Sequence, residues 1–221
     1  SSLYDKVAFA KLLDLRREFA EGGISRMVLD ARPELTNNFE NVHGGVIMRA
    51  VDEAGAVAAV RHSNGPAVTA FMDQMAFLEP VKLGDLLTTQ AQVNWTGRTS
   101  MEVGVRVTVQ RMGVEGEIHV ASAHLVFVAI DKGGQPRPVP PVLPQTEHDR
   151  LRFQEAQIRR TSRLERAAAA GDAAALEEAA HGLRGAADNL GLSALGALRR
   201  RLEATAQEGR IDTELLGQLR T

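Results

Sequence analysis

The sequence contains no cysteine, which excludes disulfide bonds, thiolate metal sites and a thiol nucleophile. No apolar run approaches the length of about 18 residues that a membrane span requires, and residues 1–12 lack the pattern of a signal peptide. The formal net charge is only −2, and one Trp and one Tyr offer little for base stacking, which argues against a nucleic-acid partner. We therefore expect a soluble, cytoplasmic protein that binds neither membranes nor nucleic acids.

The chain divides by composition near residue 145. Val, Met, Phe and Gly are frequent before this point, whereas Ala, Leu and Arg dominate after it. Residues 133–144 are dense in Pro and Gly, so they cannot continue a helix or a central strand. A length of 221 residues suits one domain with a smaller appendage. We predict a first domain at residues 1–145 and a second at residues 146–221.

The first part mixes one prominent helix with several strands. Residues 45–61 are almost continuously apolar and rich in small side chains, which predicts a helix that is buried on most sides and closely approached by a sheet. Strand patterns follow at residues 67–77, 86–95, 101–110 and 117–130, the third alternating strictly between apolar and other residues. This pattern predicts an α+β domain in which a long central helix is wrapped by an antiparallel sheet.

The second part consists of helix-forming residues interrupted by glycine. Residues 151–170 are predicted as one helix, followed by helices at residues 173–190 and 194–207 and by the start of another at residues 213–219. Short connections between helices favour antiparallel neighbours. The second domain is therefore predicted as a small all-α helical bundle.

The residues around the start of the first helix are the best candidates for chemistry. His43, Gly44 and Gly45 precede the helix, where backbone N–H groups lie free at its positive end and glycines let a ligand approach closely. Such a site suits a carbonyl oxygen that gains negative charge during acyl transfer. Asp52 lies two turns further along, where burial makes a carboxylate costly unless it is paired or acts as a general base or nucleophile.

Structural interpretations stay open for each of these residues. A Gly-Gly pair is commonly only a tight turn, and His43 can be a structural hydrogen-bonding group. Asp52 can instead pair with an arginine, and the candidates are Arg49, Arg98 and Arg106.

Together these motifs resemble the hotdog-fold acyl-CoA thioesterases of the cytosolic acyl-CoA hydrolase type. The shared core is Asn-Val-His-Gly-Gly-Val-Ile-Met at residues 41–48 and Asp-Glu-Ala-Gly at residues 52–55. Further motifs follow in the same order, among them Val-Thr-Ala at residues 68–70 and Gly-Arg-Thr-Ser at residues 97–100. One departure is Glu40, where several relatives carry glycine, so the geometry of that loop is open.

The resemblance implies hydrolysis of acyl-CoA to a free fatty acid and CoA. In that family the aspartate matching Asp52 is the catalytic base or nucleophile, and the asparagine matching Asn37 positions water or the thioester across a subunit interface. Gly44 and Gly45, after the motif histidine His43, match the glycines that contact the oxyanion. Relatives join two hotdog units in one chain, so a single unit implies a homodimer, and the family suggests tetramers or hexamers.

Coenzyme A is expected only as a part of the substrate, with no separate cofactor and no metal. Because coenzyme A carries phosphates, basic groups should line its entry. Arg98, in a turn with Thr99 and Ser100, is the best candidate. Arg61 and Arg137 come behind it, and for these two an ordinary solvated arginine is an equally good interpretation.

The second part carries a motif of its own. Arg184 follows His181 by one helical turn, where it can hold a phosphoryl group near the imidazole, and Gly185 leaves room for a partner. The pattern His-x-Leu-Arg-Gly-(x)4-Leu-Gly resembles the histidine-phosphotransfer (HPt) domain. This resemblance implies that His181 accepts a phosphoryl group from a response-regulator receiver domain. The last helix of such bundles is normally longer than the residues 213–221 that remain here.

Three functions are compatible with the sequence. The leading hypothesis is an acyl-CoA thioesterase that is regulated through a phosphotransfer-like module. A second is a hotdog acyl-CoA binder or dehydratase, which fits the order of His43 and Asp52 less well. A third is a signalling or acyl-CoA-sensing protein that uses the hotdog unit as a dimerisation platform and His181 as the phosphoacceptor.

Overall fold

The computed structural model describes residues 13–169, which fall into two compact units. The first unit comprises residues 13–94 and 101–136 of this range, and the second comprises residues 95–100 and 137–169. The helices predicted at residues 173–190, 194–207 and 213–219 lie outside the described residues.

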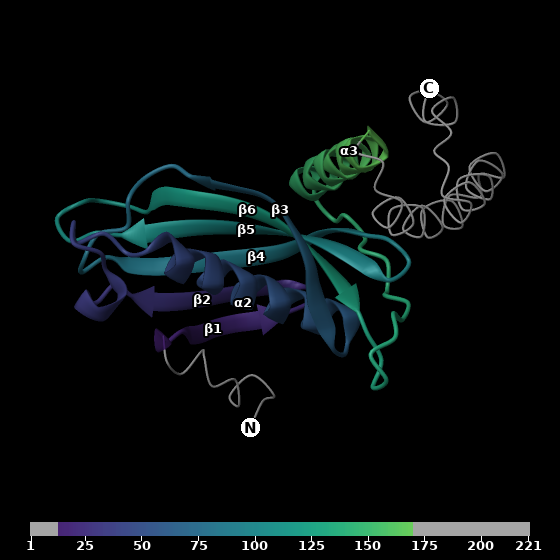
Figure 1. Cartoon of the computed structure of the whole chain (residues 1–221), viewed down its shortest axis with the longest axis horizontal. Helices are drawn as coiled ribbons and strands as arrows, with labels where there is room; N and C mark the ends of the chain where they lie inside the picture. Colours follow the sequence, from purple (N-terminus) through teal and green to yellow (C-terminus); the bar gives the residue numbers. More distant parts are fainter. Residues whose placement is uncertain (1–12, 170–221) are drawn as a thin grey trace, which may run out of the picture. The chain divides into compact units, whose positions relative to one another are not determined.

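Six strands form one sheet in the order β1-β2-β4-β5-β6-β3 (Figure 1). The strand β2 pairs antiparallel with both β1 and β4, and β3 pairs antiparallel with β6. The strands span β1 Arg16–Glu21, β2 Ile24–Asp30, β3 Ala67–Phe77, β4 Leu86–Thr96, β5 Ser100–Gln110 and β6 Ile118–Ala129. The predicted antiparallel sheet is thus present, and β3 forms one of its edges.

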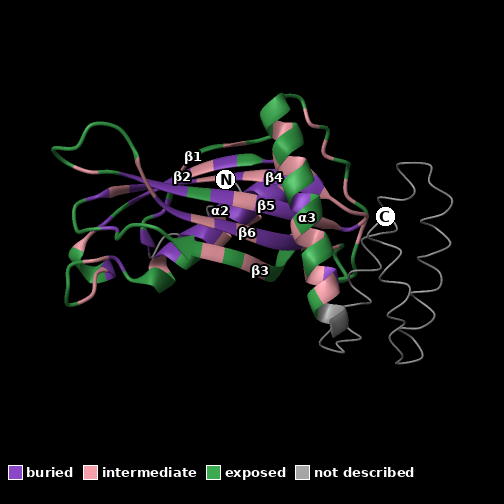
Figure 2. Ribbon diagram, turned by 90° about the horizontal axis from the view of Figure 1, so that it is seen from above, coloured by how far each residue is buried: buried purple, intermediate pink, exposed green. Residues whose placement is uncertain are grey.

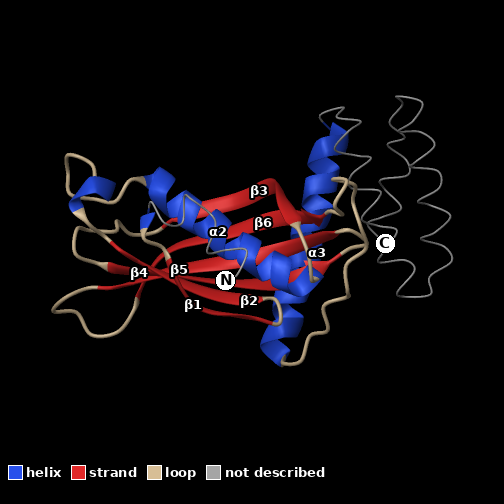
Figure 3. Ribbon diagram, turned by 90° about the horizontal axis from the view of Figure 1, so that it is seen from below, coloured by secondary structure: helices blue, strands red, loops and turns tan. Residues whose placement is uncertain are grey.

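The helix α2 spans Gly44–Ser63 and lies across one face of this sheet (Figure 3). Small residues allow the close approach that the sequence predicts. A Cβ atom on Gly55 would come within 3.0 Å of the Phe127 ring, and Ser25 Oγ donates a hydrogen bond of 2.7 Å to the Ala54 carbonyl. The exposed residues of α2 lie near its two ends, Met48 and Arg49 among them, whereas no residue between positions 50 and 60 is exposed. The expectation of a helix buried on most sides is therefore confirmed for the middle of α2, and its start is open.

The core lies between α2 and the middle of the sheet, where Figure 2 shows the buried residues of β4, β5 and β6. The apolar face predicted for β5 is confirmed, because Met101, Val103, Val105, Val107 and Val109 are all buried. Glu102 and Thr108, on the other face of the same strand, are buried as well.

Two strands, β1 and β2, were not predicted from the sequence. In β1 (Arg-Arg-Glu-Phe-Ala-Glu) charged residues outnumber apolar ones, and most of its residues are exposed or half-buried at the sheet edge. Such a strand has no apolar alternation to reveal it. The short helix η2, Pro33–Leu35, follows β2 and leads toward α2.

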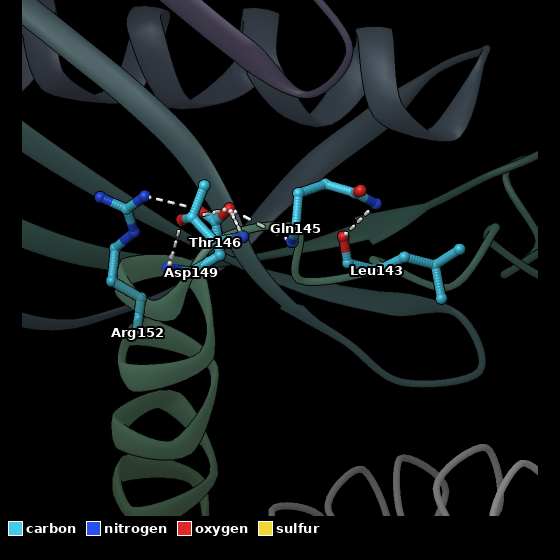
Figure 4. Close-up of polar contacts among 5 residues, drawn as sticks. All are labelled: Leu143, Gln145, Thr146, Asp149 and Arg152. Atoms are coloured by element: carbon cyan, nitrogen blue, oxygen red, sulfur yellow. Dashed lines mark hydrogen bonds and ion pairs between the residues drawn. The ribbon is translucent and has the colours of Figure 1, made fainter.

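The helix α3 spans Glu147–Ala169, so it begins earlier than the predicted residue 151. Thr146 and Asp149 explain the earlier start (Figure 4): the Asp149 N–H donates to Thr146 Oγ1 at 3.1 Å, and the Thr146 N–H donates to Asp149 Oδ2 at 3.0 Å. Arg152 adds a 2.7 Å ion pair to Asp149 Oδ1. This reciprocal pattern is a capping box with Asp in the place of Glu.

In the part of the chain that the structure describes, no helix combines the length and apolar character needed to cross a membrane.

Candidate functional site

The start of α2 presents backbone donors to its surroundings. His43 is the N-cap residue, yet its side chain makes no capping hydrogen bond. Its carbonyl accepts hydrogen bonds from the N–H groups of Val46 at 2.9 Å and Ile47 at 3.3 Å. His43, Gly44 and Gly45 are all exposed, and within residues 13–169 no acceptor is recorded for the N–H of either glycine. The predicted free donors are therefore available at this end of the helix.

The two glycines are not required by packing within the described chain. A Cβ atom on Gly45 would meet no atom within 4 Å, and a Cβ atom on Gly44 would make only ordinary contact, 3.6 Å, with the Phe77 ring. Neither residue has a positive φ that would demand glycine. Small residues at these positions instead keep the helix end open.

Asp52 lies half-buried on α2 beside the edge strand β3. Thr69 of β3 donates a hydrogen bond of 2.7 Å from its Oγ1 to Asp52 Oδ1. Of the arginines considered as partners, Arg49 forms an ion pair of 3.5 Å with Glu53, the neighbour of Asp52. No described arginine forms an ion pair with Asp52, so the structural interpretation of Asp52 as an ion-pair partner is not supported within residues 13–169.

Thr69 belongs to the Val-Thr-Ala motif at residues 68–70, but nothing in its local sequence marks it as a site residue. Only the tertiary structure identifies Thr69, because the packing of the helix α2 beside the strand β3 brings Asp52 and Thr69 together although they are far apart in the chain. The hydroxyl holds one carboxylate oxygen and leaves the other, Oδ2, available for a further partner.

Glu53 has a different environment from Asp52. Burial raises the pKa of Glu53, Arg49 counteracts this effect, and the negative charge of Asp52 raises the pKa further. Its side chain is only 12% exposed and faces Arg49. Glu53 therefore has a structural ion pair, whereas Asp52 has none with any residue that the structure describes.

Asn37 stabilises the loop before α2 with its side chain. Its Oδ1 accepts hydrogen bonds from the N–H groups of Phe39 at 2.9 Å and Asn41 at 3.3 Å. These bonds form an Asx-type turn and fix the orientation of the amide. The Nδ2 group, for which no acceptor is recorded in the described chain, is then left as a donor.

Glu40 occupies the tip of this loop with a φ of +58°. Residues with a side chain other than Asn or Asp rarely adopt this left-handed region, whereas glycine adopts it readily. The loop geometry that the sequence left open is therefore a left-handed turn at Glu40, a conformation in which glycine would be unstrained.

A second loop holds the first one in place. The Val42 N–H donates to the Val81 carbonyl at 2.7 Å, and the Leu83 N–H donates to the Glu40 carbonyl at 2.9 Å. Asp85 closes this second loop: Arg111 donates to both of its carboxylate oxygens, at 2.9 and 2.8 Å.

Asp85 is buried, with a side chain that is 2% exposed. Burial opposes its ionisation, but hydrogen bonds from Arg111 and from the Lys82 N–H outweigh this effect and hold the pKa of Asp85 below its ordinary value. Arg111 also donates to the Pro80 carbonyl at 3.0 Å. The start of α2 is therefore positioned by an ion pair that lies well away from it in the sequence.

The groups predicted to receive phosphate belong to both units. Arg98, Thr99 and Ser100 form the β4–β5 turn in the second unit, in which the Gly97 N–H donates to the Ser100 carbonyl at 2.8 Å. Arg98 and Ser100 are half-buried, and Thr99 is buried. Arg137 belongs to the same unit, whereas Arg61 is exposed in the last turn of α2 in the first unit.

The spacing along α2 separates two parts of the predicted site. Asp52 follows Gly44 by eight residues, which at a rise of ~1.5 Å per residue places them about 12 Å apart along the helix axis. A reacting carbonyl must lie within about 3 Å of both the attacking group and the oxyanion donors. One helix therefore cannot supply both groups to the same carbonyl.

His181 and Arg184, the residues predicted for phosphotransfer, lie outside the described residues. Across residues 13–169, no group of three or more His, Asp or Glu side chains is arranged to hold a metal ion.

Comparison with known proteins identifies both parts of the chain. Residues 39–115 match the Thioesterase superfamily, and residues 151–221 match the Hpt domain. An uncharacterized acyl-CoA thioester hydrolase of Bacillus subtilis is 35% identical over 144 residues, which cover 64% of this chain and 84% of that protein. The cytosolic acyl coenzyme A thioester hydrolase of Mus musculus is 33% identical over 53% of this chain, which spans only 32% of that longer protein.

Solved structures agree with these relatives. A hexameric acyl-CoA thioesterase in its apo form matches with a TM-score of 0.64 and 34% identity, covering 66% of this chain and 94% of that one. The acyl-CoA hydrolase of Staphylococcus aureus, in complex with butyryl coenzyme A, coenzyme A and coenzyme A disulfide, matches with a TM-score of 0.62 and 32% identity, covering 66% and 88%. Three mutants of that hydrolase replace an aspartate, an asparagine or a threonine by alanine.

The family assignment follows from these matches together with the fold. The antiparallel sheet with its long helix is shared with acyl-CoA thioesterases of known structure. The match to the Bacillus subtilis hydrolase extends over most of the length of that protein. The chain therefore belongs to the thioesterase superfamily, and its relatives there include acyl-CoA thioester hydrolases.

Proposed function

We propose that this chain hydrolyses acyl-CoA to a carboxylic acid and coenzyme A, with Asp52 at the centre of the reaction. The observation that carries this proposal is the hydrogen bond between Thr69 and Asp52, a carboxylate without an arginine partner in the described chain. In the Staphylococcus aureus hydrolase, the asparagine, aspartate and threonine chosen for mutation are spaced along the chain as Asn37, Asp52 and Thr69 are here.

Asp52 has two ways to carry out the reaction. As a general base it takes a proton from water, whose oxygen attacks the thioester carbonyl; the C–S bond then breaks and the sulfur of coenzyme A takes up a proton. As a nucleophile it attacks the carbonyl itself, coenzyme A leaves, and water hydrolyses the resulting anhydride. In both cases Thr69 orients the carboxylate through Oδ1 and leaves Oδ2 toward the reacting atom.

The remaining groups stabilise the developing charge. The exposed N–H groups at Gly44 and Gly45 lie at the positive end of α2 and suit the oxyanion. His43 places these two donors by accepting the first hydrogen bonds of the helix. Asn37, whose amide is fixed by its own loop, donates through Nδ2 to water or to the thioester.

We infer a site shared by two chains, because Asp52 and Gly44 are too far apart on one helix to serve one carbonyl. The edge strand β3 is a suitable contact, since it carries Thr69 and exposes apolar residues, Val68 and Phe71 among them. An exposed edge strand of this kind is a template for pairing with a second copy. A homodimer is the minimal assembly, and the hexameric acyl-CoA thioesterase among the related structures supports a larger assembly of such dimers.

Arg98, Thr99 and Ser100 are proposed to bind the phosphates of coenzyme A, with Arg61 and Arg137 as weaker candidates. The Ser100 and Thr99 hydroxyls and the Arg98 guanidinium are donors of the kind that phosphate oxygens accept. The fatty acyl group is the remaining part of the substrate, and no further cofactor is proposed.

The C-terminal part adds a proposed regulatory function. Residues 151–221 match the Hpt domain, so we place the domain boundary near residue 145 and assign His181, with Arg184 beside it, as the phosphoacceptor for a receiver domain. The same match supports the alternative of a signalling protein in which the first domain only senses acyl-CoA. The cytosolic relative in Mus musculus favours a cytoplasmic location.

Steady-state hydrolysis of an acyl-CoA series tests the activity and separates an enzyme from a sensor. Because the chain has no cysteine, a reagent that traps the released thiol gives no background from the protein. Hydrolysis above the rate without protein is expected for at least one chain length. Binding of acyl-CoA without turnover would contradict the proposed activity.

Mixing two inactive variants tests the shared site. Asn37→Ala subunits exchanged with Asp52→Asn subunits should regain part of the activity, because each hybrid dimer contains one intact site. The absence of recovery after verified subunit exchange would show that each site is built within one chain.

Transfer from a phosphorylated receiver domain tests the regulatory part. His181→Gln should abolish labelling and leave basal hydrolysis unchanged, and Arg184→Ala should slow labelling because a charge-assisted contact to phosphate is lost. If no receiver domain labels His181, the C-terminal part has a structural role instead.

A further inference from the structure

The β4–β5 turn and helix α3 meet within the second unit. Trp95, the only tryptophan of the chain, is buried at the end of β4. The guanidinium carbon of Arg160, in α3, lies 5.1 Å from the centre of the Trp95 ring. This distance falls inside the range of about 6 Å in which a cation is attracted to an aromatic face.

The contact between Arg160 and Trp95 is shielded from water on the Trp95 side, because Trp95 is buried and Arg160 is half-buried. Burial, together with the charge of Arg163, lowers the pKa of Arg160 to about 10. The guanidinium therefore remains charged at neutral pH although it has lost much of its hydration. A cation in this state is attracted to an indole ring more strongly than an exposed one, because water competes less for its charge.

Backbone contacts tie the same turn to the segment that precedes α3. The Val139 N–H donates to the Arg98 carbonyl at 2.9 Å, and the Val142 N–H donates to Thr96 Oγ1 at 2.9 Å. Gly97 packs so closely on the Trp95 ring that a Cβ atom would come within 2.8 Å of it. The ring therefore lies directly against the backbone beside Arg98, so a displacement of the ring toward Gly97 would push on this turn.

We propose that Arg160 is a positioning residue for coenzyme A: by holding Trp95 in place, it fixes the turn that carries Arg98. This inference rests on the proposed function of Arg98 in binding phosphate. Because α3 is also the first segment of the residues that match the Hpt domain, a change that moves α3 alters the affinity for acyl-CoA. Reciprocally, binding of coenzyme A alters the environment of Trp95.

The test uses the full-length chain and its single tryptophan. Arg160→Met keeps the length and helix propensity of the side chain but removes its charge. We expect KM for acyl-CoA to rise about three- to tenfold while kcat stays within about twofold, because only binding depends on the turn. The emission of Trp95 should change in the same variant, and Arg160→Lys, which keeps a cation, should lie between it and the wild type.

Arg150→Met is the matched control, because Arg150 lies in the same helix, is 58% exposed and pairs only with Glu147 among the recorded ion pairs. It should leave KM and the Trp95 emission unchanged. Titration with coenzyme A should change the emission of the wild type and of this control.

A comparison of Arg98→Gln with Arg160→Met separates the positioning role of Arg160 from the proposed phosphate binding by Arg98. If Arg98→Gln raises KM but Arg160→Met does not, the positioning role is overturned and the binding role of Arg98 stands. If Arg98→Gln leaves KM unchanged, coenzyme A binds elsewhere and both proposals fail. A rise in KM for Arg150→Met equal to that for Arg160→Met would attribute the effect to α3 as a whole and overturn the role of the Trp95 contact.

Discussion

The two helices of the described chain begin in opposite ways. At the start of α3, Thr146 and Asp149 satisfy each other's backbone N–H groups in a capping box. At the start of α2, His43 provides no side-chain cap, and the N–H groups of Gly44 and Gly45 are exposed. A cap of the α3 kind stabilises a helix by about 1 kcal/mol, so α2 lacks a stabilisation that α3 has.

The aspartates of the two helices differ in the same way. Each accepts a hydrogen bond from a threonine hydroxyl, at 2.7 Å for Asp52 and 2.8 Å for Asp149. Asp149 also accepts hydrogen bonds from backbone N–H groups and from the Arg152 guanidinium, so both of its carboxylate oxygens have partners within the chain. Asp52 has only Thr69 in the described chain. We read the difference as one between a helix start that serves stability and one that serves a ligand.

The largest effect is expected from Asp52→Asn. The amide keeps the shape of the side chain but cannot act as base or nucleophile, so kcat should fall by about 10²–10⁴-fold with the fold retained. Asp149→Asn is the matched control and should leave kcat unchanged. Hydrolysis rates and circular dichroism of both variants provide the measurement, and near wild-type turnover of Asp52→Asn would show that this aspartate is structural.

A second test removes a single donor from the helix start. Proline fits the first position of a helix, and His43, with φ −56° and ψ 134°, has the conformation that a residue before proline adopts. Gly44→Pro should therefore fold normally but lose about 10²–10³-fold in kcat, as expected for one oxyanion donor. Gly44→Ala, which keeps the N–H, should retain much of the activity.

Glu147→Pro places proline at the equivalent position of α3 and serves as the control. It should fold and leave kcat unchanged, because that N–H serves no substrate. An equal loss of kcat in Gly44→Pro and Gly44→Ala would show that the added side chain, and not the missing donor, causes the effect.

The sequence predicted the elements whose residues alternate or cluster by polarity. The buried face of β5 and the position of α2 follow from apolar patterns, and both appear as expected. In contrast, β1 carries mostly charged side chains at the sheet edge, so nothing in its sequence marks it as a strand. The earlier start of α3 is encoded by Thr146 and Asp149, whose spacing is typical of a capping box, whereas a composition typical of helices predicts a start only at residue 151.

The candidate site was predictable only where its residues are consecutive. His43, Gly44 and Gly45 form one motif, and Asp52 follows on the same helix, so their positions could be derived before the fold was known. Thr69 and Asp52 meet through pairing of helix and strand, and Trp95 meets Arg160 across 65 residues of chain (160 − 95). Contacts of this kind require the tertiary structure, because no local pattern encodes them.

A third test concerns what holds the uncapped helix start in place. Arg111→Met leaves the buried Asp85 carboxylate without its guanidinium, which should lower the free energy of unfolding by about 3 kcal/mol at neutral pH. Because the pKa of Asp85 is lowered in the folded state, this stability is present above its ordinary pKa and is lost as the pH falls through the folded value.

The difference between wild type and Arg111→Met should therefore persist from neutral pH down to the ordinary pKa of an aspartate, about 4, and shrink as the pH falls below it, as urea unfolding at several pH values would measure. A difference that does not depend on pH would attribute the loss to packing of the Arg111 side chain and not to the ion pair.

The smallest effect is expected at Glu40, which has a φ of +58° in the loop before α2. No residue just before α3 has a positive φ, so the two helix starts differ in this respect as well. A side chain in this left-handed region costs about 1–2 kcal/mol, and asparagine tolerates it better than glutamate. Glu40→Asn should therefore raise the free energy of unfolding by about 0.5–1 kcal/mol. Glu40→Gly should raise it less, because glycine also increases the conformational entropy of the unfolded chain.

Glu34→Asn is the control, because Glu34 lies in the helix η2 and has no positive φ, and it should not raise the free energy of unfolding. Urea midpoints of the three variants measure the effect. If Glu40→Asn is no more stable than Glu34→Asn, the loop before α2 is not strained, and the left-handed conformation of Glu40 carries no cost that the start of α2 must offset.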